Sequence, residues 1–260
     1  MAWFHVPASL HQSADDIASA LPQDLDALPR LNGFRLRGIE PTRLETFIDA
    51  AFAFAITLMV IVTGDVPRDM GVLLSAFRNV PAFIASVLVL GIFWQGHWLW
   101  SRRYGLEDGV SILISWGLIM TVLIYVYPLR ALFSSMFYFL SRHWAGQLLT
   151  ARSWGQVRAL FAVYAGGFAA IALSIWLLNW RAWCLRDALR LNARERLLTR
   201  RELGGWSLPV TVGLVSLVLA WLLPVRYVAW SGWVYFSLAL LVPMHRRRTR
   251  AKVREMERGI

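Results

Sequence analysis

Six long apolar segments constrain the fold of this chain more than any other feature. They cover residues 44–62, 81–100, 110–127, 157–180, 208–223 and 227–243. Each has at least about 16 residues, and a helix of about 20 residues crosses the hydrocarbon core of a bilayer. The last two segments are the shortest and give the weakest signal. The pattern predicts an all-α, polytopic membrane protein with six transmembrane helices per subunit.

The composition agrees with a membrane environment and argues against several other classes. Apolar residues make up 57% of the 260 residues, more than a soluble domain of this length buries. The single cysteine, Cys184, provides neither an internal disulfide nor a cysteine-based metal cluster, so we expect no structural metal. The net charge of +11 would suggest nucleic acid in a soluble protein. Because the arginines lie between the apolar segments, we expect no nucleic-acid partner.

The basic residues also predict the orientation in the membrane. If both termini are cytoplasmic, the inner segments hold the basic residues of 30–43, 102–103, 181–201 and 246–258, and the outer segments hold far fewer. Loops rich in arginine and lysine stay on the cytoplasmic side. We therefore predict a multi-pass protein of the cell inner membrane with both termini in the cytoplasm.

Three regions follow from this pattern: a polar N-terminal extension over residues 1–40, a six-helix transmembrane domain over 41–244 and a basic cytoplasmic tail over 245–260. Within the extension we expect one short helix around Ala14–Ala20. Between Arg181 and Gly205, leucine and alanine recur at helical spacing among arginines, which predicts a cytoplasmic helix continuing from the fourth span. The arginines of Arg181–Arg201 and the tail can attract anionic lipid headgroups at about 1 kcal/mol per charge, although a solvated loop explains the same charges.

The first apolar segment is unusual because charged residues lie at its amino end. It reads RLETFIDAAFAFAITLMVIV and begins with Arg43, Glu45 and Asp49. An ionised aspartate inside a helix end costs several kcal/mol if it has no partner. Arg43 and Asp49 lie on different sides of an ideal helix, so partners on the second span are expected, where indole and imidazole groups offer N–H donors. We predict a polar lock between the first two spans, formed by Arg43, Asp49, Trp94 and His97.

The same segment carries one stripe of residues at helical spacing: Ala50, Phe54, Thr57 and Ile61. Several copies of this stripe around an axis would form a pore, with Phe54 and Ile61 as apolar constrictions and Thr57 offering oxygen to a partly dehydrated cation. The alternative is ordinary helix packing, with the Thr57 hydroxyl bonded to its own backbone. Spacing by itself favours that second interpretation.

The first segment also resembles the signature of the transmembrane-protein-175 potassium channels. The residues that carry the resemblance are Arg43, Phe47, Ile48, Asp49, Ala50, Thr57 and Leu58. Three further stretches resemble the next spans of that family: VPAFIASVLVLGIFWQGHWLW, EDGVSILISWGLIMTVLIYVYPL and VRALFAVYAGGFAAIALSIWLLNW. The likeness extends from about residue 43 to residue 243 and is absent from the extension and the tail.

The resemblance implies a homotetramer with a central pore lined by the first helix, and no cofactor apart from the permeant potassium ion. The pore-lining positions of the family then fall on Ala50, Phe54, Thr57, Leu58 and Ile61. The chain departs from the family where Ile48 replaces the signature serine, which removes a hydroxyl from the polar lock. Phe54 replaces a usual leucine or isoleucine, and its ring can narrow the path.

Other functions stay open at this point. A secondary transporter would be expected to show inverted repeats or ionisable residues at mid-membrane depth, and the span centres hold almost none. A non-conducting membrane scaffold would use the same polar lock and packing. The motifs G-x-S-x-G and H-E-x-x-H do not occur, so an enzyme has little support. We predict a potassium-permeable channel subunit, with a secondary transporter or a scaffold as alternatives.

Overall fold

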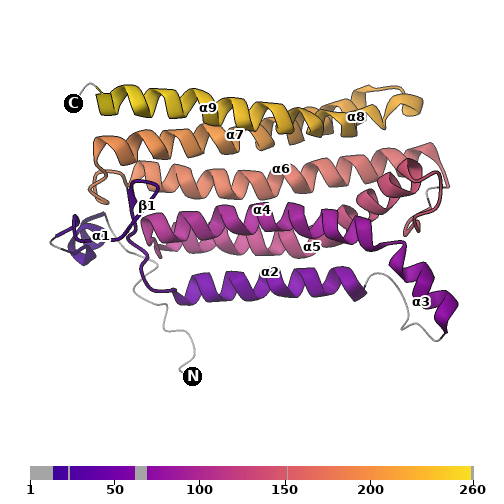
Figure 1. Ribbon diagram of the computed structural model, residues 1–260, viewed down its shortest axis with the longest axis horizontal. Coiled ribbons are helices and arrows are strands. Elements are labelled where there is room, and N and C mark those ends of the chain that lie inside the picture. The colour runs from indigo at the N-terminus through magenta and orange to yellow at the C-terminus, as the bar shows by residue number, and fades with distance from the viewer. Residues whose placement is uncertain (1–13, 23, 62–68, 151, 259–260) are drawn as a thin grey trace.

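The computed structural model describes residues 14–22, 24–61, 69–150 and 152–258, which form a bundle of long helices with a small hairpin at one end (Figure 1). The long helices are α2 (Arg43–Ile61), α4 (Val80–Tyr104), α5 (Gly109–Leu140), α6 (Trp154–Cys184) and α7 (Ala193–Leu222). These five are long and apolar enough to cross a membrane. Over the described residues, the first five predicted spans match these helices to within one residue at any end that extends past them, which confirms the all-α membrane fold.

The sixth predicted span is not a single helix of this kind. It consists of a 3-10 turn over Val225–Tyr227, helix α8 (Trp230–Trp233), a second turn over Val234–Phe236 and helix α9 (Ser237–Arg258). The apolar part of α9 runs directly into the basic tail, so α9 as a whole is too polar to count as a span by composition. In Figure 1, α8 and α9 nonetheless run back along α7 to the end of the bundle where β1 lies.

Shorter elements lie at the two ends of the bundle. Helix α1 (Ala14–Ala20) is present where the sequence predicted a short helix, and strands β1 (Arg30–Leu31) and β2 (Phe34–Arg35) pair antiparallel. Asn32 and Gly33 form the two-residue turn between the strands, both at positive φ, as such tight hairpins require. At the opposite end, helix α3 (Met70–Phe77) connects α2 to α4.

The predicted helix between Arg181 and Gly205 does not continue from the fourth span, so that prediction is wrong. Helix α6 ends at Cys184, a tight turn follows, and residues from Ala193 onward belong to α7. Asn192 and Glu195 form a capping box that starts α7, with the side chain of each accepting from the backbone N–H of the other. This local hydrogen bonding begins a new helix where apolar periodicity suggested a continuous one.

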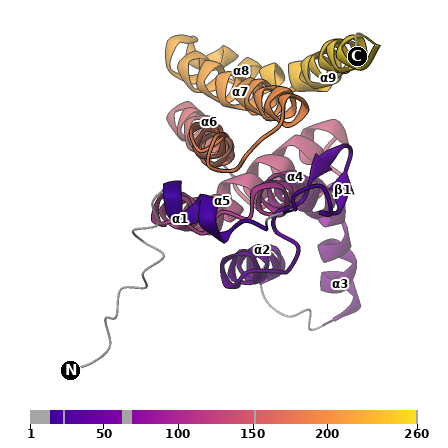
Figure 2. The same cartoon turned by 90° about the vertical axis from the view of Figure 1, so that its left-hand side faces the viewer.

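Helix α6 lies between two layers of the bundle. Figure 2 shows α4 and α5 on one side of it, α7 to α9 on the other, and α2 beyond α4 and α5. Its inner side chains Ile171, Ala172, Ile175 and Leu178 are fully buried. A side chain at Gly213 of α7 would place its Cβ 2.9 Å from the Cβ of Ala169. The α6–α7 packing therefore depends on the absence of a side chain at that glycine.

Candidate functional site

Helix α2 forms an outer layer of the bundle and is covered on one side only (Figure 2). Its buried residues recur at helical spacing: Glu45, Ile48, Phe52, Ala55 and Met59. Such a stripe defines the face that packs against the neighbouring helices α4 and α5. The opposite face of α2 has no covering element among the described residues of this chain.

Four of the five predicted pore residues lie on that uncovered face. The side chains of Ala50 and Thr57 are exposed, and Phe54 and Ile61 are 55% and 64% exposed. Leu58 differs, because it is partly buried and packs against the core of the bundle. The stripe recognised in the sequence is therefore a continuous free surface, and Leu58 lies beside it.

The uncovered face of α2 mixes small and large side chains. It carries Ala50, Ala53 and Thr57 together with the large apolar side chains of Phe54 and Ile61. Small residues let helix backbones approach one another closely inside a membrane. The small residues of this face are therefore compatible with contact to other protein helices.

The Thr57 hydroxyl donates a hydrogen bond to the carbonyl oxygen of Ala53, at 3.1 Å. This bond satisfies the hydroxyl proton within the helix. A hydroxyl oxygen has two lone pairs and remains an acceptor when its proton is donated. Thr57 therefore presents an acceptor oxygen on a stretch of this face, from Ala50 to Ile61, that is otherwise apolar.

Two polar contacts fasten the amino-terminal half of α2 to α4. The indole Nε1 of Trp94 donates to Oδ1 of Asp49 at 2.7 Å. One turn earlier, the carboxylate of Glu45, which is 2% exposed, accepts from the Ser101 hydroxyl and pairs with the Arg102 guanidinium, each at 3.1 Å. Both contacts lie on the side of α2 that faces the bundle.

The other two residues of the predicted polar lock lie elsewhere. His97 is buried and points toward α5, where its Nε2 is 3.2 Å from the Ser115 hydroxyl oxygen. Arg43 is exposed and has no polar partner within the part of the chain that the structure describes. The structure thus brings Asp49 and Trp94 together and separates them from Arg43 and His97.

The replacement of the signature serine by Ile48 has a structural explanation. Ile48 is fully buried among the apolar side chains of the core. A serine at such a position needs a hydrogen-bond partner, whereas isoleucine fills the space with apolar surface. Glu45 and Asp49 carry the polar connection of α2 to α4.

Sequence reasoning missed the pairing of Glu45 with Ser101 and Arg102. The signal was an acidic residue at the start of one span and basic residues at the end of the next, which antiparallel neighbours place at the same membrane face.

No group of three or more histidine, cysteine, aspartate or glutamate side chains that could hold a metal ion is found in the described ranges.

Comparisons with known proteins agree on one family. The sequence model of the family described as "Endosomal/lysosomal potassium channel TMEM175" matches residues 43–128. A protein of Marivirga tractuosa named "Potassium channel" is 32% identical over 235 residues, which covers 86% of this chain and 93% of that protein. A crystal structure of a variant of the potassium channel MtTMEM175, in complex with a nanobody–MBP fusion protein, is similar with a TM-score of 0.72 and 29% identity. It covers 86% of this chain and 100% of the solved one.

Proposed function

The chain belongs to the TMEM175 family of potassium channels, and from this premise we propose that it is a subunit of a potassium-permeable channel in which copies of α2 surround the ion path. The observation that carries the proposal is the free face of α2. This helix is anchored by one face, and the opposite face presents Ala50, Phe54, Thr57 and Ile61 in line. A single chain has one such face, so a closed path requires several copies.

Each residue of the stripe has a separate role in the proposed path. Phe54 and Ile61 lie about 10 Å apart along the helix axis, at 1.5 Å per residue. Rings of these side chains form two apolar constrictions, which can close by losing water. Thr57 lies between them and supplies acceptor oxygens that replace part of the hydration shell of a potassium ion. The small side chain of Ala50 leaves a wider section of the path on the cytoplasmic side of Phe54.

We further propose that four copies assemble. Four-fold symmetry is what the resemblance to the channel family implies, and a closed ring of identical contacts is the common way for one chain to build a symmetric pore.

We also propose six crossings, with both termini in the cytoplasm of a cell with an inner membrane. The α8–α9 segment makes the sixth crossing in this proposal, because it returns along α7 to the end where the β1–β2 hairpin lies (Figure 1). The basic loop and the basic tail then meet at one face, as the positive-inside rule requires. Residues 41–244 form the channel domain, and residues 1–40 and 245–260 are the extension and the tail.

Anionic lipid headgroups are the proposed partners of the basic inner face. Some of its arginines are already paired, since Arg181 binds Asp108 at 2.9 Å and Arg196 binds Asp187 at 2.7 Å. The guanidinium groups of Arg186, which also pairs with Asp187 at 3.6 Å, and of Arg200 lie over the Trp183 ring, 5.1 and 4.6 Å from its centroid. A tryptophan beside arginines suits the headgroup zone. We therefore assign the lipid contact to this cluster and the tail.

Electrical recording tests the proposed function. Purified protein in planar bilayers under a potassium gradient should give unitary current steps, and Phe54→Ala should increase the current by widening a constriction. Leu113→Ala is the matched control, because Leu113 is exposed on α5, away from the proposed path. This substitution should leave the current unchanged. The proposal fails if the wild-type protein gives no potassium current and Phe54→Ala gives none either. A saturable, gradient-coupled solute flux without current steps would instead indicate a transporter.

A further inference from the structure

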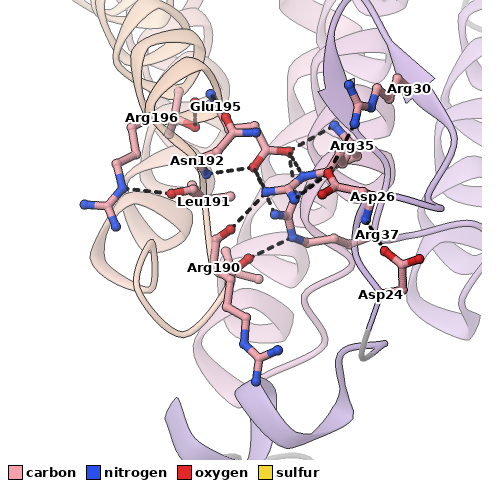
Figure 3. A network of polar contacts seen from close by, with 12 residues as sticks. Asp24, Asp26, Arg30, Arg35, Arg37, Arg190, Leu191, Asn192, Glu195 and Arg196 are labelled. Carbon is pink, nitrogen blue, oxygen red and sulfur yellow. Dashed lines mark hydrogen bonds and ion pairs between the residues drawn. The ribbon is translucent and has the colours of Figure 1, made fainter.

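The chain segment before α2 is attached to the amino end of α7 by a buried ion cluster (Figure 3). Its three members are Arg35, Arg37 and Glu195, which we call the clamp. The Glu195 carboxylate is fully buried, and both arginine side chains are almost completely covered. The cluster joins residues about 160 positions apart in the sequence.

Both oxygens of the Glu195 carboxylate are used. Oε2 lies 2.9 Å from Nη2 of Arg35 and 3.1 Å from Nη2 of Arg37, while Oε1 accepts from the backbone N–H and the Nε of Arg35, each at 3.0 Å. Hydrogen bonds to this carboxylate raise the pKa of Arg35, which favours the charged guanidinium. Charge-assisted bonds of this kind are stronger than bonds between neutral groups.

The clamp also holds the turn between α6 and α7. Arg37 donates from Nε to the carbonyl oxygen of Leu189 at 3.0 Å, and Arg35 donates to that of Arg190 at 3.1 Å. Arg190 adopts the left-handed backbone conformation, with φ of 48°, so these bonds meet a tight turn. Two cations thus share one buried carboxylate and two carbonyl oxygens of the α6–α7 turn.

The same segment lies directly on the inner end of α4. The backbone N–H of Gly38 donates to the carbonyl oxygen of Arg102 at 3.1 Å. A Cβ on Gly38 would lie 2.5 Å from the carbonyl oxygen of Ser101, so only glycine permits this approach. Phe34 is fully buried and packs edge-on against Tyr104, with ring centroids 5.4 Å apart.

Arg102 continues the connection from this segment to α2. Its Nη1 donates to the carbonyl oxygens of Gly38 and Ile39, at 3.2 and 2.8 Å, and its Nη2 pairs with Glu45 of α2 at 3.1 Å. Glu195 on α7 is therefore connected to the inner end of α2 through its bonds to Arg35 and Arg37, the backbone of residues 35–39, and the bonds of Arg102 to that backbone and to Glu45.

We propose that Arg35, Arg37 and Glu195 are positioning residues for the ion path, because they hold the inner end of α2 against its own bundle and away from the pore axis. The inference rests on the proposed function of α2. When the clamp is broken, only the contacts of Glu45 and Asp49 with α4 still hold the inner end of α2 among the polar contacts described here, so it moves more readily toward the axis, where the apolar Phe54 side chains of neighbouring copies associate. The path then spends more time closed, while its conductance when open is still set by the residues of the stripe.

Glu195→Gln tests this role, since it keeps the shape of the side chain and removes the charge shared by two arginines. The open probability of single channels should fall about five- to thirty-fold, the factor that corresponds to 1–2 kcal/mol, with unitary conductance unchanged. Glu195→Asp keeps the charge and should restore most of the open probability. Arg196→Gln is the matched control, because Arg196 is the next residue of α7 and bonds to Asp187 and to the carbonyl oxygen of Leu191, outside the clamp; it should behave as wild type.

Several results would overturn the proposal. The first is an unchanged open probability in Glu195→Gln. The second is a fall in the unitary conductance of that variant without a fall in its open probability. The third is a fall in the open probability of the Arg196→Gln control as large as that of Glu195→Gln. If Glu195→Gln does not assemble, Arg37→Gln replaces it, because Arg35 still pairs with the carboxylate in that variant. The same outcomes then apply to Arg37→Gln.

A distance measurement separates failure of the clamp from failure of the channel. Spin labels are placed by Thr46→Cys on α2 and Ala193→Cys on α7, both exposed positions, with Cys184→Ser removing the native thiol. Labelled chains are diluted with unlabelled ones so that distances within one chain dominate. Glu195→Gln should broaden the distribution and Arg196→Gln should not. Equal distributions reject the clamp whether or not current is observed, whereas a broadened distribution in a protein without current rejects only the channel function.

Discussion

The contact between Glu45 and Arg102 should contribute measurably to the stability of the protein, because it is the buried ionic link between α2 and α4. Glu45 is 2% exposed and the Arg102 side chain is 19% exposed. Glu45→Gln keeps the shape but removes the charge. Losing one partner of a buried ion pair costs about 3–5 kcal/mol when the other is left without compensation.

The expected loss is smaller here for a structural reason. Arg102 retains the carbonyl oxygens of Gly38 and Ile39 as acceptors after the change. A hydrogen bond to a charged group contributes about 1.5–3 kcal/mol. We therefore expect Glu45→Gln to lower the free energy of unfolding by about 2–3 kcal/mol.

Reversible unfolding in mixed micelles, followed by far-ultraviolet circular dichroism, measures this free energy. The single variants Glu45→Gln and Arg102→Gln are combined with the double variant in a double-mutant cycle, and the coupling energy should exceed about 1 kcal/mol. Arg30→Gln is the control, since Arg30 pairs with Asp26 at an exposed site and should change stability by less than about 0.5 kcal/mol. A coupling energy no larger than that of independent sites, about 0.5 kcal/mol, would refute the reasoning.

Three further predictions follow from other contacts. Gly213→Val should lower the free energy of unfolding by about 1–3 kcal/mol, because the added side chain meets Ala169 on α6; Gly166→Val, with nothing within 4 Å of its Cβ, is the control and should cost clearly less. Trp94→Phe removes the 2.7 Å bond to the aspartate of α2 and should lower the same quantity by about 1 kcal/mol; an unchanged unfolding curve would show that the bond contributes nothing. Thr57→Val keeps the size of the side chain and removes its oxygen, so unitary potassium conductance should fall about fivefold, the factor for roughly 1 kcal/mol; equal conductance would exclude Thr57 as an ion ligand.

Apolar periodicity predicted most of the fold because it is a local property. The first predicted span begins at residue 44, one residue after the start of α2 at Arg43. The error between α6 and α7 arose because the capping box of Asn192 and Glu195 interrupts a pattern that looks helical throughout. The last predicted segment is divided between two short turns, helix α8 and helix α9, whose apolar stretch joins a basic tail.

The free stripe of α2 was also visible in the sequence, because 3.6 residues per turn place Ala50, Phe54, Thr57 and Ile61 on one side whatever surrounds the helix. The sequence did not reveal which side of α2 the bundle covers. Leu58 is the example: it was predicted to line the pore together with Thr57, its neighbour in the chain, but its side chain packs against the core.

The amino-acid order by itself determined that the chain enters a membrane as long helices and that one helix carries an apolar stripe with a single hydroxyl. Tertiary structure alone decided the partners of its charged groups: Glu45 with Arg102, and Glu195 with Arg35 and Arg37. The physical reason is that helical periodicity depends on neighbours in the chain, whereas an ion pair forms only where the packing and relative shift of separate helices bring two charges within about 4 Å. Those distances are a property of the assembled bundle.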